Sequence, residues 1–310
     1  MATMAIMVSM IKPTTMLKGT STMRRTHSRL LSLISTALCL LAISHPATAQ
    51  LYSAGEGRVI YGHHHVNTRD VAAQQRFWIE GLGGRLTPLG SSGRDVIAFP
   101  DVLVFLTEAE PSMGTRGTLV NHVGFETKEL AADVARLSSM GYPMITREEL
   151  PDTYEVVDGI GQRVAGNTIA YVLGPDDIKV ELIENTGLEH PIQMHHIHWA
   201  TTEGDAMRAW YVEHFGAEFG SRIGQPAGQL PNVNLTFAPS ASQPLPTKGT
   251  VLDHIGFEVE NLQAFCDELA AKGVVFDRAY TEIPALGLAI AFFTDPWGTY
   301  VELTEGLDGV

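Results

Sequence analysis

Four copies of one short pattern constrain this 310-residue chain more than any other feature of its sequence. Each copy begins with histidine, continues as an extended segment, and reaches an acidic or amide residue seven positions later. The copies align without gaps; they are His63–Asp70, His122–Glu129, His196–Glu203 and His254–Asn261. Recurrence of this kind indicates a chain assembled from copies of one small folding unit.

Each copy leads into an amphipathic stretch. The Asp, Glu or Asn at its end is expected to cap the next helix, because a side-chain oxygen can accept from the free N–H groups of the first turn. Apolar residues at three-to-four spacing predict helices at 71–79, 130–140, 206–214 and 262–272. Short apolar runs then predict strands, among them 96–99, 102–106, 168–172, 179–183, 233–237, 288–293 and 300–303. The repeated unit is therefore βαβββ.

The four units are of two kinds. The second and fourth end alike, and their last strands carry Glu181 and Glu302. The first and third have Phe105 and Thr236 in the matching places. The chain is thus a duplicated pair, and we predict an α+β protein of two tandem domains, residues 58–186 and residues 193–307, each built from two consecutive modules.

The first 49 residues differ from the rest. Arg24, Arg25 and Arg29 precede an apolar run at 30–43, and Ala47-Thr-Ala49 supplies the small residues that a signal peptidase requires. We therefore expect a signal peptide at 1–49 and a periplasmic or secreted protein. No later run reaches the roughly 20 apolar residues of a membrane helix, so we expect no membrane association after cleavage.

The charge of the chain argues against nucleic acid as a partner. The formal net charge is −14, and loss of the five basic residues in 1–49 would make it −19. Such a surface repels phosphate backbones and anionic lipids, whereas it tolerates cations and small neutral ligands. Of the two cysteines, only Cys266 would remain, so an intrachain disulfide is excluded.

Residues 58–307 resemble the vicinal oxygen chelate superfamily, which includes glyoxalase I, bleomycin resistance proteins and the extradiol dioxygenases. The resemblance rests on the openings His122-Val-Gly-Phe and His254-Ile-Gly-Phe and on the ending Asp295-Pro-Trp-Gly followed by Val-Glu302-Leu. It implies that two βαβββ units form a half-open barrel holding a divalent metal. Iron or manganese is the first expectation, with zinc or nickel as the alternative.

Alternation along strands points to the same ligands, since every second side chain faces one way. If consecutive units pair, His196, His254 and Glu302 converge in the second domain, and His63, His122 and Glu181 in the first. Two histidines and one carboxylate leave coordination positions for a substrate, as in catalytic sites. Two alternatives stay open: only one domain holds metal, or a histidine-rich stretch binds metal adventitiously.

Three further residues are candidates for proton transfer. His198 and His65 each follow a ligand by two positions on the same face, and Tyr300 precedes Glu302 by two. A histidine near a cation can move a proton near neutral pH. The alternative is that His198 only supports the site or is itself a ligand. His64 and His195 point to the opposite face, where we expect surface water or backbone carbonyls to satisfy them.

The sequence therefore predicts an exported, metal-dependent enzyme acting on a small oxygen-chelating substrate, with the layout of an extradiol dioxygenase. A glyoxalase-type lyase or isomerase is the second interpretation. In such relatives a further carboxylate comes from the partner unit, but here Phe105 and Thr236 stand in its place. A non-catalytic binding protein is the third. A homodimer is compatible with all of them.

Overall fold

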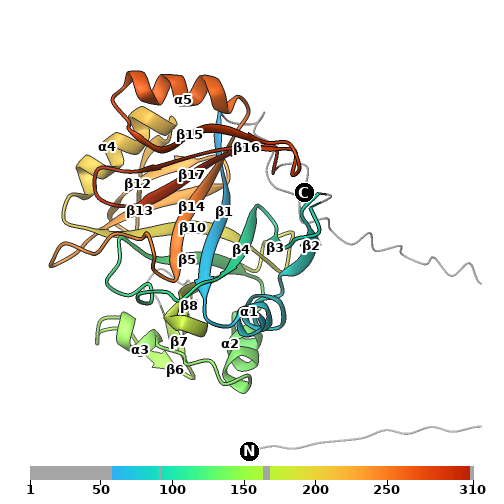
Figure 1. Cartoon of the computed structure of the whole chain (residues 1–310). Helices are drawn as coiled ribbons and strands as arrows, with labels where there is room; N and C mark the ends of the chain where they lie inside the picture. The colour runs from blue at the N-terminus through green and yellow to red at the C-terminus, as the bar shows by residue number, and fades with distance from the viewer. Residues whose placement is uncertain (1–57, 91, 163–167, 308–310) are drawn as a thin grey trace, which may run out of the picture. The chain divides into compact units, whose positions relative to one another are not determined.

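The computed structural model describes residues 58–90, 92–162 and 168–307 (Figure 1). The predicted signal peptide, residues 1–49, lies outside the described residues. Among the described residues, no helix has both the length and the apolar character needed to cross a membrane.

The four repeated units each contain a first strand, a helix and a short meander of strands. The first module comprises β1 (Val59–Thr68), α1 (Val71–Gln75), the π-helix η2 (Arg76–Gly81), β2 (Arg85–Pro88), β3 (Asp95–Phe99) and β4 (Val102–Glu108). The second comprises β5 (Val120–Thr127), α2 (Leu130–Ser139), α3 (Thr146–Glu149), β6 (Val156–Val157), β7 (Ile160–Gln162), β8 (Thr168–Leu173), the 3₁₀ turn η3 (Pro175–Asp177) and β9 (Lys179–Glu184).

The second half of the chain repeats this arrangement. The third module comprises β10 (Ile192–Thr201), α4 (Gly204–Phe215), β11 (Glu218–Arg222), β12 (Gln225–Leu230) and β13 (Val233–Pro239). The fourth comprises β14 (Leu252–Val259), α5 (Leu262–Ala271), β15 (Phe276–Ile283), β16 (Leu288–Thr294) and β17 (Tyr300–Glu305). The predicted α+β class is confirmed, and the predicted helices and strands agree with these bounds to within a few residues.

The strands form two mixed sheets whose composition differs from the prediction. The eight-stranded sheet has the order β15-β16-β17-β14-β1-β4-β3-β2, and the nine-stranded sheet has the order β11-β12-β13-β10-β5-β9-β8-β7-β6. The first module therefore shares a sheet with the fourth, and the second with the third. The prediction that consecutive modules share a sheet is wrong, because β1 pairs antiparallel with β14 and β10 pairs antiparallel with β5.

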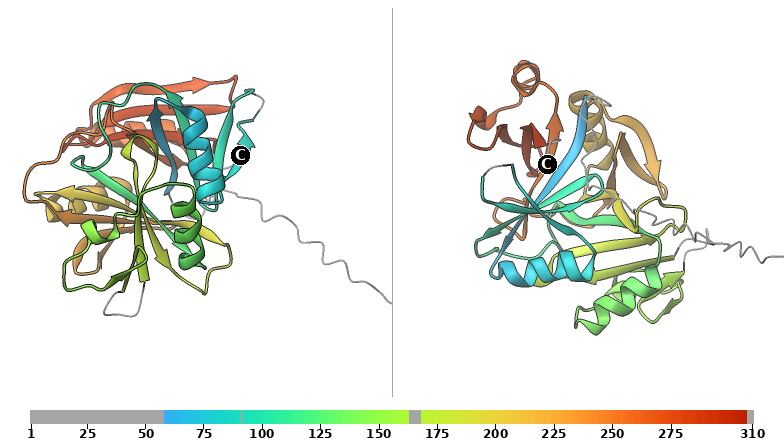
Figure 2. Two further views of the ribbon diagram at one scale, coloured as in Figure 1. Left: turned by 90° about the horizontal axis from the view of Figure 1, so that it is seen from below. Right: turned by 90° about the vertical axis from the view of Figure 1, so that its right-hand side faces the viewer.

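Consecutive modules meet instead through their helices. Figure 1 shows α5 beside α4, and both views in Figure 2 show α1 beside α2. Lys272 at the end of α5 donates to the backbone oxygen of Glu213 in α4 at 2.7 Å, and Arg136 of α2 donates to the backbone oxygen of Gly81 at 3.1 Å. Each half of the chain is thus joined at its helices, while its strands reach across to the other half.

The largest core cluster joins residues of both sheets and all four modules. Its aromatic members include Trp78, Phe125, Trp199 and Phe257, none of which exposes any surface. His64 also lies among these side chains, with no exposed surface, and its Nδ1 is bonded to the Tyr61 hydroxyl. The expectation that surface water or a backbone carbonyl satisfies His64 is therefore wrong, because the non-site face of β1 is covered by the core.

Two of the four expected helix caps are present. Asp70 accepts from the backbone N–H of Ala73 at 3.0 Å, and Asn261 accepts from that of Ala264 at 3.1 Å. Glu129 and Glu203 make no such side-chain bond. The short Asp and Asn side chains turn back onto the first turn of a helix, whereas glutamate has one more methylene and is not a favoured cap.

Candidate metal centres

Six of the predicted ligands converge in two groups, but the groups differ from those expected. One comprises His63, His254 and Glu302, which we call the first centre. In the second, His122, Glu181 and His196 are joined by His198, and we call these four the second centre. His63 and His196 have exchanged places relative to the prediction, because each ligand set follows its sheet and the sheets combine modules one with four and two with three.

At the first centre, two imidazoles face one carboxylate oxygen. The Nε2 atoms of His63 and His254 each lie 2.9 Å from Oε2 of Glu302. His63 comes from β1, His254 from β14 and Glu302 from β17, three neighbouring strands. All three side chains are buried, and Glu302 is the most exposed at 9%.

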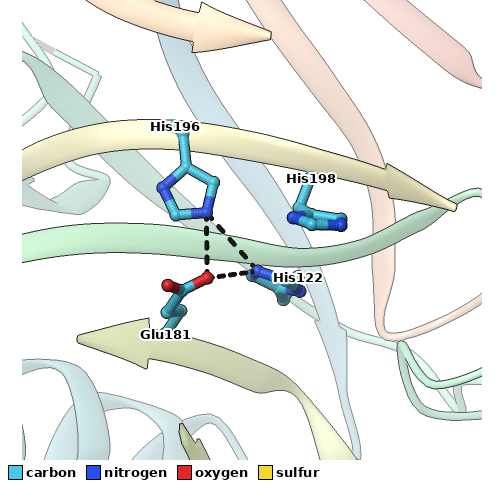
Figure 3. A group of neighbouring side chains, drawn as sticks. All are labelled: His122, Glu181, His196 and His198. Carbon is cyan, nitrogen blue, oxygen red and sulfur yellow. Dashed lines mark hydrogen bonds and ion pairs between the residues drawn. The ribbon is translucent and has the colours of Figure 1, made fainter. Parts of the chain in front are cut away.

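The second centre repeats this geometry (Figure 3). Oε2 of Glu181 lies 2.9 Å from Nε2 of His122 and 3.2 Å from Nε2 of His196, and the two Nε2 atoms are 3.4 Å apart. His198 also extends from β10, and its ring stacks on that of His122 with centroids 4.3 Å apart. The chain thus carries two copies of one constellation.

The glycine of each His-apolar-Gly-Phe opening makes room for a ligand. His63 is paired with Gly256 across β1 and β14, and His196 with Gly124 across β10 and β5. A Cβ atom at Gly256 would lie 1.9 Å from the His63 ring, and one at Gly124 would lie 1.8 Å from the His196 ring. The motif therefore combines a histidine ligand with the space for the imidazole of the partner strand.

Burial and mutual contact set the electrostatics of both centres. Burial lowers the pKa of His122 and that of His196 to about 3. Burial by itself would raise the pKa of Glu181, but the nearby His196 and hydrogen bonds from His122 and His196 hold it well below its ordinary value. Glu302 follows the same pattern, with His63 the main group that lowers its pKa against burial. Both glutamates are therefore carboxylates at neutral pH.

Asp253 and Asn121, which the sequence interpretation missed, fix how two ligands present their nitrogens. Nδ1 of His254 donates to Oδ1 of Asp253 at 2.6 Å, and Nδ1 of His122 donates to Oδ1 of Asn121 at 3.0 Å. Each of the two residues directly precedes a ligand histidine, and this position was the one sequence signal that could have identified them. The signal was weak, because neighbouring side chains on a strand point to opposite faces and are not expected to touch.

The donor atoms of both centres could hold a cation. Because Asp253 takes the Nδ1 proton of His254, the neutral ring offers a lone pair at Nε2 toward a carboxylate oxygen, which also only accepts. Burial alone would lower the pKa of His254, but its bonds to Asp253 and Glu302 raise it above the usual value, so a proton can fill the gap. A divalent ion fits as well, since ligand atoms about 2.1 Å from a metal lie about 3.0–3.4 Å apart.

The surroundings of the two centres differ. The first centre borders a cavity of about 190 Å³ whose lining includes His63 and Glu302. At the second, Oε1 of Glu181 receives a hydrogen bond from Nη2 of Arg222 on β11 at 3.4 Å. Arg222 was not singled out from the sequence, because its strand carries no repeated motif.

The predicted proton-transfer residues lie in three different settings. His65 lines the cavity beside the first centre, and His198 belongs to the second centre. Tyr300 packs 5.5 Å from the ring of His254, stacks on Phe292 and carries the Lys248 ammonium 3.9 Å above its ring centroid. Tyr300 lies two residues before Glu302 on β17, so its side chain contacts His254. Tyr300 is not among the residues that line the cavity. Proton transfer by any of the three stays a prediction.

Comparisons with known proteins agree with this architecture. Glyoxalase I from Zea mays is 18% identical, with a TM-score of 0.61 over 81% of this chain and 94% of that chain. A putative dioxygenase from Bacillus subtilis subsp. subtilis str. 168 is 14% identical, with a TM-score of 0.55 over 79% of this chain and 84% of that chain. At these identities the likeness shows the fold alone.

The family comparison addresses the third and fourth modules. No curated protein matches the chain. The resemblance drawn from the sequence motifs is confirmed, and residues 193–303, which span the third and fourth modules, match the Glyoxalase/Bleomycin resistance protein/Dioxygenase, or vicinal oxygen chelate, superfamily.

Proposed function

We propose that this protein is a divalent-metal-dependent enzyme whose reaction takes place at the first centre. The observation that carries the proposal is that His63, His254 and Glu302 converge beside a cavity. Three protein ligands leave coordination positions open, as catalytic sites require. The cavity gives a substrate a place from which to reach them.

The lining of the cavity defines the class of substrate. Nine of its sixteen lining residues are aliphatic or aromatic, and Arg94 and Asp95 add two charged side chains besides the ligands. Its volume of about 190 Å³ suits a compact molecule. We therefore propose a small substrate with an apolar part, which carries two neighbouring oxygen atoms at one end that are directed toward the ligands.

The protein's own residues prepare the site in distinct ways. A divalent ion held there would supply Lewis-acid stabilisation of charge developing on substrate oxygen. Asp253 orients His254 through its bond to Nδ1. His65 bonds to Oγ1 of Thr107 at 2.7 Å, and burial lowers its pKa to about 3, so it offers the substrate an uncharged polar contact.

The donor set favours the dioxygenase type over the isomerase type. Phe105 occupies the position where glyoxalase-type relatives would supply a further carboxylate. Its ring centroid lies 4.9 Å from that of His63. The site is thereby limited to two histidines and one carboxylate, a set typical of non-haem iron oxygenases. We accordingly propose iron or manganese as the ion.

Metal analysis combined with activity assays tests the proposal. The full chain is purified without a histidine tag, its metal content is measured, and the metal-free protein is reloaded with Fe(II), Mn(II), Zn(II) or Ni(II). We expect oxygen uptake on catechol-type substrates with iron or manganese. Turnover of aldehydes or epimers with zinc or nickel would instead support the lyase or isomerase interpretation.

A charge-matched pair of variants locates the reaction. Glu302→Gln should abolish turnover and remove metal from the first centre. Glu305→Gln, three residues along β17, is the control, because Glu305 instead accepts from the backbone N–H of Leu262 at 2.9 Å. Full activity in Glu302→Gln would overturn the assignment of the first centre. Ligand binding that is unchanged in metal-free protein would support a binding protein.

We also propose that the enzyme acts outside the cytoplasm. The support is the arginine-flanked apolar run and the Ala47-Thr-Ala49 site. Expression of the full chain in a bacterial host, followed by fractionation and N-terminal sequencing, should recover protein beginning at Gln50 in the periplasm or medium. A cytoplasmic product that retains residues 1–49 would contradict export.

A further inference from the structure

We propose that the second centre is a closed, four-ligand metal site with a stabilising role, and that His198 is its fourth ligand. The other ligands are His122, Glu181 and His196. This inference does not depend on the reaction proposed for the first centre.

The internal repeat identifies what distinguishes His198 from its counterpart His65. In the eight-stranded sheet, Nε2 of His65 forms a hydrogen bond with Oγ1 of Thr107. Thr107 pairs across the strands with Asn67, which lies two positions after His65. In the other sheet the position that corresponds to Thr107 is Ala238, which has no hydroxyl group. Nδ1 of His198 is buried without a hydrogen-bond partner. Nδ1 of His198 is therefore available to an ion, whereas Nε2 of His65 is held by Thr107.

Distances at the second centre suit a single ion. The separations of 2.9, 3.2 and 3.4 Å among His122, Glu181 and His196 match the spacing of donors around one metal. One ligand atom of His198 lies within 4.8 Å of the other three. At the first centre the corresponding group stops at three residues, since His65 does not belong to it.

Burial indicates the role of this site. His196 exposes none of its surface, Glu181 exposes 1% and His122 exposes 2%, while His198 is partly exposed and has a buried Nδ1 atom. Closed sites with four protein ligands are typical of structural zinc, whereas reactive sites keep a position for substrate. Nη2 of Arg222 bonds Oε1 of Glu181, and Oε2 is the atom that faces Nε2 of His122 and of His196. The same guanidinium could instead compensate the carboxylate in the absence of metal, and the experiment separates these outcomes.

Zinc titration of the full chain tests the inference, with the Glu302→Gln background reporting on the second centre alone. We expect two zinc ions per chain in the wild type and one in Glu302→Gln. In that background His198→Ala should weaken the remaining site at least about tenfold, the lower bound for loss of even an outer-shell partner. His65→Ala is the matched control and should leave that affinity unchanged.

A spectroscopic and a thermal readout complete the test. Cobalt(II) at the second centre should give the intense visible bands of a four-coordinate ion, and these should weaken in His198→Ala. Zinc should raise the thermal midpoint of Glu302→Gln in a concentration-dependent way, because an ion that binds only the folded state stabilises it. If His198→Ala fails to fold, Ala238→Thr serves instead; it restores the missing hydroxyl and should weaken zinc binding while Thr107→Ala does not.

Three results would overturn the inference. One is a Glu302→Gln protein that binds no zinc, which would show that Arg222 alone compensates Glu181. Another is zinc affinity that is unchanged by both His198→Ala and Ala238→Thr. The third is a six-coordinate cobalt spectrum that is insensitive to His198.

Discussion

At the scale of single residues, the two centres differ most in what holds the second nitrogen of a ligand histidine. Asp253 is a carboxylate and Asn121 is an amide, although the two residues occupy equivalent places before His254 and His122. A carboxylate makes the imidazole a stronger donor to a metal than a neutral amide does. The protein thus holds one ligand histidine with a carboxylate and the equivalent histidine with an amide, so the two effects can be compared within one chain.

We predict that Asp253→Asn weakens metal binding at the first centre by about 10–100-fold, the usual effect of losing an outer-shell partner. The measurement is competition with a chromophoric chelator. Asn121→Asp is the reciprocal variant, and it should strengthen binding at the second centre. An unchanged affinity in Asp253→Asn would show that the contact does not orient His254.

The glycines opposite the ligands give a second prediction at this scale. Gly256→Ala should displace the His63 ring, remove metal from the first centre and destabilise the fold by about 1–3 kcal/mol, the usual cost of overpacking. Metal analysis and urea unfolding measure the two effects. Gly62→Ala on β1 is the control, because its Cβ would meet its nearest neighbour at an ordinary 3.4 Å. Normal metal content in Gly256→Ala would contradict the steric role.

At the scale of elements, each half of the chain is completed by the other. His63 on β1 needs His254 and Glu302 from the second half, whereas His196 on β10 needs His122 and Glu181 from the first. Consecutive modules are joined by contacts between helices, such as that of Lys272 with Glu213, and by side-chain bonds such as that of Thr68 with Asp176 at 2.6 Å. Neither half contains a complete centre in this arrangement.

We therefore predict that fragments 58–187 and 188–307 complement each other. Each fragment alone should bind metal poorly, and the mixture should form a one-to-one complex that binds metal at both centres. Size-exclusion chromatography with metal analysis provides the measurement. A single fragment that binds one ion tightly would instead show that consecutive modules can pair, as the sequence predicts.

At the scale of the whole molecule, buried uncharged histidines make stability depend on pH. Burial lowers the pKa of His64, His65, His122 and His196 to about 3, and it lowers that of His198 well below its usual value. Unfolding returns these groups to an ordinary value near 6.5. Below that pH the unfolded chain binds more protons than the folded one, so stability falls as the pH falls. His254, whose pKa is raised, acts in the opposite direction.

We predict that metal-free protein loses stability steadily as the pH falls below about 6.5, by about 1.4 kcal/mol per pH unit for each net proton taken up on unfolding. Urea midpoints measured in the presence of a chelator test this prediction. His64→Gln removes one such histidine without touching a ligand, so its slope should be smaller by about one proton. Equal midpoints at pH 7.5 and pH 5 would contradict it.

Much of this architecture could be predicted from the chain because the signals are local. Histidine-led strands, three-to-four apolar spacing and the Val-Glu-Leu endings predicted the four main helical segments, eleven of the seventeen strands in the described residues, and all six ligands. Asp70 and Asn261 cap their helices as expected, because capping involves residues three positions apart. The glycines of the two His-apolar-Gly-Phe openings are visible in the sequence as a motif. Their steric role became clear only from the structure, because the histidine that needs the space lies on the paired strand.

The tertiary structure alone decided which modules share a sheet, and hence which ligands share an ion. β1 and β10 both carry histidines two residues apart, and β5 and β14 both carry the glycine that accommodates them, so either pairing satisfies every local rule. The choice is made by pairings between distant strands: β1 pairs with β14, where His63 lies opposite Gly256, and β10 pairs with β5, where His196 lies opposite Gly124. Such pairings join residues that are far apart in the chain, and no periodicity within the chain encodes them.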